Sequence, residues 1–111
     1  MNNVIDEEAL QKRYGGRDAM INKLSSTFLR THSDTSGKIR DAIRDEDFES
    51  LHQMAHSIKG LSGYLEATEL FRISKDAEMM TENQDDKALE TCAELANALD
   101  RVVDALSDRV S

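Results

Sequence analysis

A length of 111 residues is close to the common size of one domain and leaves too few residues for a core together with an elaborate catalytic cavity. The absence of proline, an aromatic content of 5% and a charged content of 32% favour a folded, soluble, all-helical domain over a disordered chain. The net charge of −8 argues against nucleic-acid binding and direct membrane binding, because an acidic surface repels phosphate backbones and anionic lipids.

The first half of the chain predicts a short helix and a longer helical segment. The short helix is expected at about residues 6–14, after which Gly15 and Gly16 turn the chain. The second segment, at about residues 17–44, carries apolar residues at steps of three and four. Residues 32–37 are poor helix formers, so we expect a kink or short break there, or else one long, strained helix. The residues expected to face inward are Ile5, Ala9, Leu10, Ile21, Leu24, Phe28, Thr31, Thr35, Ile39 and Ala42.

Three further helices are predicted in the second half from capping residues and apolar stripes. Asp45 is the expected N-cap of a helix that runs to about residue 64. Thr68 is the expected cap of the next helix, which ends near residue 83, and Asp85 or Asp86 caps the last helix. The residues expected to face inward are Phe48, Leu51, Ala55, Ile58, Ser62, Leu65, Leu70, Ile73, Ala77, Met80, Leu89, Cys92, Leu95, Ala96, Leu99, Val102, Val103, Leu106 and Val110.

Four amphipathic helices with short connections can bury their stripes only against one another. The expected fold is therefore all-α, an antiparallel four-helix bundle that forms one domain over residues 1–111, with the short N-terminal helix covering one end or edge. Cys92 is expected to be a small buried hydrophobe, and a single cysteine suits a reducing compartment. The acidic start of the chain has no signal-peptide pattern and no apolar run approaches the roughly 20 residues that span a bilayer, so we expect a cytoplasmic location.

The predicted helix at about residues 46–64 carries a second, polar face beside its core face. On a helical wheel this second face consists of His52, His56, Lys59, Gly60 and Gly63. A glycine costs roughly 1 kcal/mol relative to alanine inside a helix, so two glycines within four residues need an explanation. Gly60 lies one turn after His56 and leaves space beside its ring, where the Lys59 ammonium can also reach.

These residue types suit phosphoryl transfer. A neutral imidazole nitrogen is a good nucleophile near neutral pH, and a nearby ammonium can pair with phosphate oxygens. Phosphoryl transfer depends mainly on positioning and on charge stabilisation around an in-line displacement. The sequence contains no Gly-rich phosphate cradle and no evident nucleotide or Mg²⁺ site, so we expect these parts to come from a partner.

The run from His56 to Gly60, preceded by Ala55 and followed by Gly63, resembles the signature of histidine-containing phosphotransfer (HPt) domains. That family has an H-x-x-K-G motif on the second helix of a four-helix bundle. The chain length, the short leading helix and Phe48, eight residues before the histidine, extend the resemblance over nearly the whole chain.

The resemblance implies that His56 is the phosphorylated residue, that Lys59 faces the phosphate and that Gly60 clears the approach. It implies a phosphocarrier without autokinase activity, which takes phosphate from an aspartyl phosphate of one receiver domain and passes it to another, with Mg²⁺ held by the receiver. The expected partners are response-regulator receiver domains and a hybrid sensor histidine kinase, and the expected state is a monomer. His52 and Gly63 are candidate partner-binding residues. One departure is Glu66, where the family often has glycine; a left-handed conformation there would cost about 1 kcal/mol.

Two other interpretations remain open at this stage. The same bundle can serve as a helical adaptor that binds without phosphate, and such an adaptor would bind equally well with glutamine in place of His56. The i, i+4 spacing of His52 and His56 also permits a metal site, with His32 or Glu69 as a further ligand. The chain can be a free-standing protein or the cytoplasmic C-terminal piece of a membrane-bound hybrid sensor kinase.

Overall fold

The structure is a computed structural model that describes residues 4–110. Over these residues it consists of helices joined by short turns, with no strand, which confirms the all-α class. The helices are α1 (Glu7–Tyr14), α2 (Asp18–His32), α3 (Thr35–Arg44), α4 (Phe48–Tyr64), α5 (Thr68–Glu82) and α6 (Ala88–Val110).

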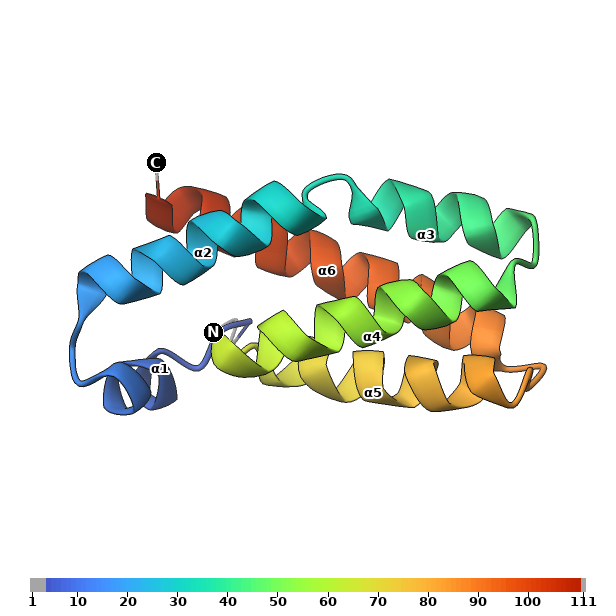
Figure 1. Cartoon of the computed structure of the whole chain (residues 1–111), viewed down its shortest axis with the longest axis horizontal. Coiled ribbons are helices and arrows are strands. Elements are labelled where there is room, and N and C mark those ends of the chain that lie inside the picture. Colours follow the sequence, from blue (N-terminus) through green and yellow to red (C-terminus); the bar gives the residue numbers. More distant parts are fainter. Residues whose placement is uncertain (1–3, 111) are drawn as a thin grey trace.

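The helices form an antiparallel bundle whose first arm is broken into two pieces. Figure 1 shows α2 and α3 following one another along the length of the molecule, after which α4, α5 and α6 run back, forward and back again. α1 lies across one end, where Arg109 Nη1 donates to Glu7 Oε1 at 2.6 Å and the Tyr14 hydroxyl donates to the Tyr64 carbonyl at 2.7 Å. The expected bundle with a short N-terminal helix at one end is confirmed.

The inward-facing stripes meet in one continuous core. Most residues expected to face inward are buried or partly buried, and Cys92 is fully buried, as predicted. Burial raises the pKa of the Cys92 thiol to about 11, so this cysteine remains a neutral, unreactive hydrophobe. The prediction that Val110 faces inward is wrong: Val110 is the last residue of α6 and is 37% exposed.

The predicted break in the second segment is present, and it changes which residues face inward. α2 ends at His32 and α3 begins at Thr35, so the segment is two helices rather than one strained helix. The prediction that Thr31 faces inward is wrong: Thr31 is exposed and its hydroxyl donates to the Thr27 carbonyl at 2.8 Å. His32 takes the inward position instead. Its ring meets the Phe28 ring edge-on at 5.1 Å between centroids, and its Nδ1 lies 3.1 Å from the Thr35 hydroxyl oxygen.

His32 should make the stability of the bundle depend on pH. Its Nε2 is buried without a hydrogen-bond partner, and burial lowers the pKa of the ring below its ordinary value. As the pH falls below about 6.5, the unfolded chain takes up this proton more readily than the folded chain, so the free energy of unfolding decreases. His32→Phe should remove this part of the pH dependence. Chemical denaturation of both proteins at about pH 7.5 and about pH 5.5 measures it; an equal loss of stability in both would contradict the assignment.

Two of the three predicted helix caps are wrong. Asp45 ends α3 rather than starting α4; the N-cap of α4 is Asp47, whose side chain accepts from the Ser50 backbone N–H at 3.1 Å. Glu46, between these two aspartates, adopts a left-handed conformation (φ 52°), which reverses the chain direction before α4 begins. Thr68 is the first residue of α5, and its N-cap is Ala67, which makes no side-chain capping bond.

The third cap prediction, at the start of the last helix, fits the structure better. Asp85 Oδ1 accepts from the Lys87 backbone N–H at 2.8 Å in the turn that leads into α6. Lys87 lies before Ala88, the first residue of α6, so this bond stabilises the turn that leads into the helix rather than an N–H group of the helix itself.

Glu66, at the position where the family often has glycine, connects α4 and α5 in a left-handed conformation (φ 56°). Two contacts with α1 and its N-cap hold it in place. The Asp6 N–H donates to the Glu66 carbonyl at 3.0 Å, and the Glu66 carboxylate pairs with Arg13 Nη1 at 3.2 Å. The turn therefore combines local backbone strain with an ion pair to a distant part of the chain.

Glycine at position 66 should relieve this strain. In a chain that carries Arg13→Ala, the further change Glu66→Gly should raise the free energy of unfolding by about 1 kcal/mol, since glycine adopts a left-handed conformation freely. In the wild-type background the gain should be smaller, because the ion pair with Arg13 is lost as well. Urea unfolding of the four proteins tests this; no gain in the Arg13→Ala background would show that the turn is unstrained.

Candidate functional site

His56 lies in the middle of α4 on the side that faces away from the core. The core side of the same helix is fully buried at Leu51, Ala55 and Ile58, which fixes the rotation of the helix in the bundle. The His56 side chain is 69% exposed. Packing on one face of α4 therefore presents an imidazole to solvent on the other, as the helical wheel predicts.

Glu78, on the neighbouring helix α5, contacts two residues of the predicted face. Its Oε2 hydrogen-bonds with His56 Nδ1, and its Oε1 pairs with Lys59 Nζ at 2.6 Å. The Glu78 side chain is only 17% exposed. The hydrogen bond from Lys59, reinforced by the one from His56, lowers the pKa of Glu78 against the opposing effect of its burial, so the carboxylate is ionised near neutral pH.

An ionised Glu78 determines which nitrogen of His56 is available. A carboxylate can only accept hydrogen bonds, so His56 Nδ1 must be the donor and must carry the ring proton. In the neutral ring, Nε2 then has the free lone pair. The exposed imidazole is thus oriented with its proton toward α5 and with the nucleophilic nitrogen not engaged by Glu78.

His52 lies one turn before His56 and contacts the backbone of α5. Its Nδ1 lies 2.9 Å from the Glu78 carbonyl oxygen and 3.3 Å from the Thr81 hydroxyl oxygen, and the ring is partly buried. His52 therefore links α4 to α5 next to Glu78. Its predicted contact with a partner stays a prediction.

Gly60 and Gly63 have different surroundings. A Cβ added at Gly60 would meet no atom within 4 Å, so the space beside His56 is open. A Cβ added at Gly63 would lie 3.3 Å from two carbons of the Phe71 ring. The absence of a side chain at Gly63 thus has a reason inside the molecule, because it lets Phe71 of α5 pack closely against α4.

The model of the Hpt domain family matches residues 23–108, which is most of the chain. The chain belongs to the Hpt domain family. Members of this family act in histidine phosphotransfer within two-component phosphorelays and interact with response-regulator receiver domains. The match confirms the resemblance seen in the sequence, whereas no curated protein and no solved structure matches the chain.

Sequence reasoning did not find Glu78 in this Hpt domain. Nothing in the residues around it distinguishes it from a surface glutamate, since Met79 beside it is exposed and Ala77 is part of the core. The signal lies in the hairpin formed by α4 and α5. His56 and Glu78 lie equally far along the chain from Ala67, and so do Gly63 and Phe71, so folding the hairpin about this residue brings each pair together.

The structure of this Hpt domain gives no support to the interpretation of His52 and His56 as metal ligands. In residues 4–110, no three histidine, cysteine or acidic side chains are grouped so that they could hold a metal ion. His32 is buried beside Phe28, and Glu69 forms an ion pair with Arg101.

Among the helices that the structure describes, none is long and apolar enough to cross a membrane.

Proposed function

We propose that this Hpt domain accepts a phosphoryl group on Nε2 of His56 from the aspartyl phosphate of a receiver domain and passes it to another receiver domain. The observation that carries the proposal is that one largely buried carboxylate, that of Glu78, contacts both His56 and Lys59. An exposed imidazole with a defined tautomer, a cation one turn away and open space at Gly60 meet the needs of a phosphoryl acceptor.

In the proposed step the Nε2 lone pair attacks phosphorus, the P–N bond forms and the P–O bond to the receiver aspartate breaks. The aspartate leaves as a carboxylate. The ring becomes positively charged during the attack, and the ionised Glu78 stabilises that charge through Nδ1–H. Lys59, which is 30% exposed, can move from Glu78 to a phosphate oxygen. Transfer to the second receiver reverses these bond changes.

The receiver domains supply what the chain lacks. When bound to a receiver, Mg²⁺ neutralises charge on the phosphoryl oxygens. We infer that the chain needs no cofactor of its own, that it has no autokinase activity, that it works as a monomer in the cytoplasm, and that a hybrid sensor kinase stands upstream. The acidic surface, with a net charge of −8, supports a protein partner over a nucleic acid.

Labelling experiments test this proposal. A phosphorylated receiver domain with Mg²⁺ should transfer acid-labile, base-stable phosphate to the purified chain, as expected for phosphohistidine. ATP alone should transfer none. Failure of every receiver in a panel from the source genome to label the chain would contradict the proposal, and so would strong self-labelling from ATP.

Side chains at position 60 should separate folding from transfer. Gly60→Ala should fold normally and gain up to about 1 kcal/mol of stability, because an alanine is the better helix former and its Cβ meets no atom. Gly60→Arg should also keep its helical circular dichroism, but its side chain should slow transfer by at least about tenfold by occupying the approach to His56. Equal transfer rates for the alanine and arginine variants would show that the approach does not pass over Gly60.

A further inference from the structure

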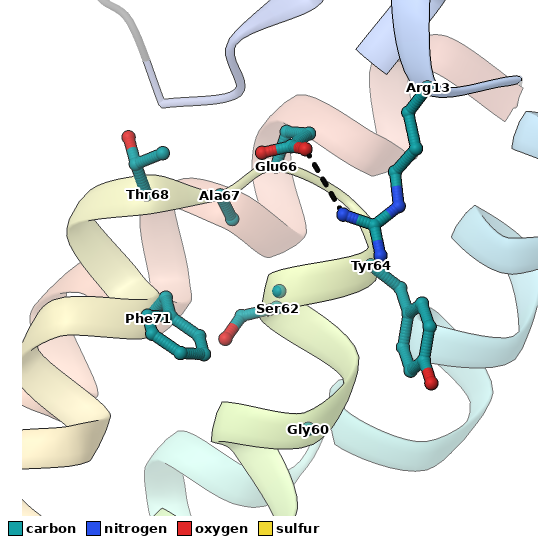
Figure 2. Close-up of a pocket in the computed structure, with 9 residues that line it drawn as sticks. Arg13, Gly60, Ser62, Tyr64, Glu66, Ala67, Thr68 and Phe71 are labelled. Carbon is teal, nitrogen blue, oxygen red and sulfur yellow. Dashed lines mark hydrogen bonds and ion pairs between the residues drawn. The ribbon is translucent and has the colours of Figure 1, made fainter. Parts of the chain in front are cut away.

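A hollow of about 440 Å³ lies at the end of α4 that is nearer to the turn into α5. Its lining comes from three parts of the chain: the last turns of α4, the beginning of α5, and α1. We call it the α4–α5 hollow and define it by Gly60, Gly63, Tyr64 and Phe71 together with Arg13. Figure 2 shows Phe71 on one side of this turn of α4 and Tyr64 with Arg13 on the other.

The two aromatic residues of the α4–α5 hollow are unusually exposed. Tyr64 is 54% and Phe71 38% exposed, whereas Phe28 is fully buried and Phe48 and Tyr14 are partly buried. Phe71 is held in place by its contact with Gly63. Aromatic residues at the surface beside a concave space are typical of protein–protein contacts, where they form anchors at low entropic cost.

Arg13 closes the α4–α5 hollow without making it strongly charged. Its guanidinium lies 5.3 Å from the centroid of the Tyr64 ring and pairs with the Glu66 carboxylate (Figure 2). The pairing neutralises the charge of Arg13, and the stacking presents the flat face of the guanidinium beside an aromatic ring. The hollow is therefore suited to an apolar side chain rather than to an anion.

The α4–α5 hollow is continuous with the proposed phosphoryl site. Gly60 belongs to both, because it lines the hollow and leaves the open space one turn after His56. A protein that brings an aspartate to His56 must therefore cover Gly60 and with it the edge of the hollow. α1 lies outside residues 23–108, the segment that matches the family model. Arg13 therefore lines the hollow from a part of the chain that the family model does not cover.

We infer that the α4–α5 hollow receives an apolar side chain of the receiver domain, and that Arg13 on α1 selects among receiver domains by limiting which side chains fit. This inference rests on the proposed function. It assigns to Phe71 and Tyr64 a binding role, to Gly63 the role of seating Phe71, and to α1 a part in specificity.

Two phosphate donors separate this inference from the proposed function. Phosphoramidate is a small donor whose P–N bond breaks, releasing ammonia, as the new P–N bond to Nε2 forms; it needs no docking surface. Phe71→Ala and Tyr64→Ala should be labelled by phosphoramidate as fast as the wild type. Their labelling by a phosphorylated receiver should be slower by at least about tenfold. Met20→Ala is the matched control, because Met20 is 43% exposed but does not line the hollow, and it should behave as the wild type with both donors.

The role of Arg13 has its own readout. Arg13→Ala should change the order of transfer rates across a panel of receiver domains, rather than lower all rates by one factor. Wild-type transfer rates in both aromatic variants would overturn the docking inference and leave the proposed function intact. Slow transfer by Tyr64→Ala would not come from unfolding, because Tyr64 is largely exposed and its truncation should not unfold the chain. An unchanged order in Arg13→Ala would overturn the selection by α1. Labelling of the wild type by phosphoramidate but by no receiver would instead contradict the proposed function.

Discussion

His56→Gln should accept no phosphate from a receiver domain and should still bind that receiver with nearly wild-type affinity. The glutamine amide has no nucleophilic nitrogen, because its lone pair is delocalised into the carbonyl group. It can nevertheless donate to Glu78 and preserve the surface of α4. Phosphate labelling and isothermal titration with the receiver measure the two properties separately. Loss of one with retention of the other identifies His56 as the acceptor rather than as a structural residue.

This pair of measurements also decides between the phosphocarrier and the adaptor. An adaptor would lose nothing with glutamine at position 56, whereas a carrier loses its only function there. His52→Gln provides a control on the same helix, since the His52 ring is bonded to the α5 backbone and should still allow phosphate uptake on His56. Phosphate uptake by the His56→Gln variant would contradict the assignment of the acceptor.

Glu78→Ala should slow phosphoryl acceptance by about tenfold or more, and Glu78→Gln should restore only part of the rate. A hydrogen bond to a charged group contributes about 1.5–3 kcal/mol, and each 1.4 kcal/mol corresponds to a factor of ten. The alanine variant loses the acceptor that keeps the proton on Nδ1, so its ring can place the proton on Nε2 and block the nucleophile. Glutamine keeps an acceptor oxygen for Nδ1–H but carries no charge.

Nitrogen NMR of the His56 ring distinguishes this positioning role from a general effect on folding. The wild type and Glu78→Gln should show the proton on Nδ1, and Glu78→Ala should show a larger share of the tautomer with the proton on Nε2. A slow Glu78→Ala variant with an unchanged tautomer would show that Glu78 acts by another route, such as the placement of Lys59. Equal rates in all three proteins would remove Glu78 from the mechanism.

The sequence predicts the helices well because their apolar stripes repeat at helical spacing over several turns. It misplaces details that depend on tertiary contacts or on a single dihedral angle. His32 rather than Thr31 faces inward, since Phe28 and Thr35 supply contacts that favour a buried imidazole. Asp47 rather than Asp45 caps α4, since Glu46 turns the chain in between.

The candidate site was only partly predictable for a similar reason. His56, Lys59 and Gly60 belong to one helix, so a helical wheel places them on one face. Glu78 belongs to another helix, and its contact with His56 depends on the register of the α4–α5 hairpin, which the pattern of a single helix does not contain. Gly63 was grouped with the exposed face, but the neighbouring helix brings Phe71 against it.

Locating the phosphoryl group on the ring of the labelled protein tests directly whether His56 carries it on Nε2. Phosphorus and nitrogen NMR of the chain, after transfer from a receiver domain, should show phosphate on Nε2 of His56 with the proton retained on Nδ1 toward Glu78. Phosphate on Nδ1 of His56, or on any other residue, would contradict the proposal that Glu78 directs His56 to carry the phosphoryl group on its exposed nitrogen.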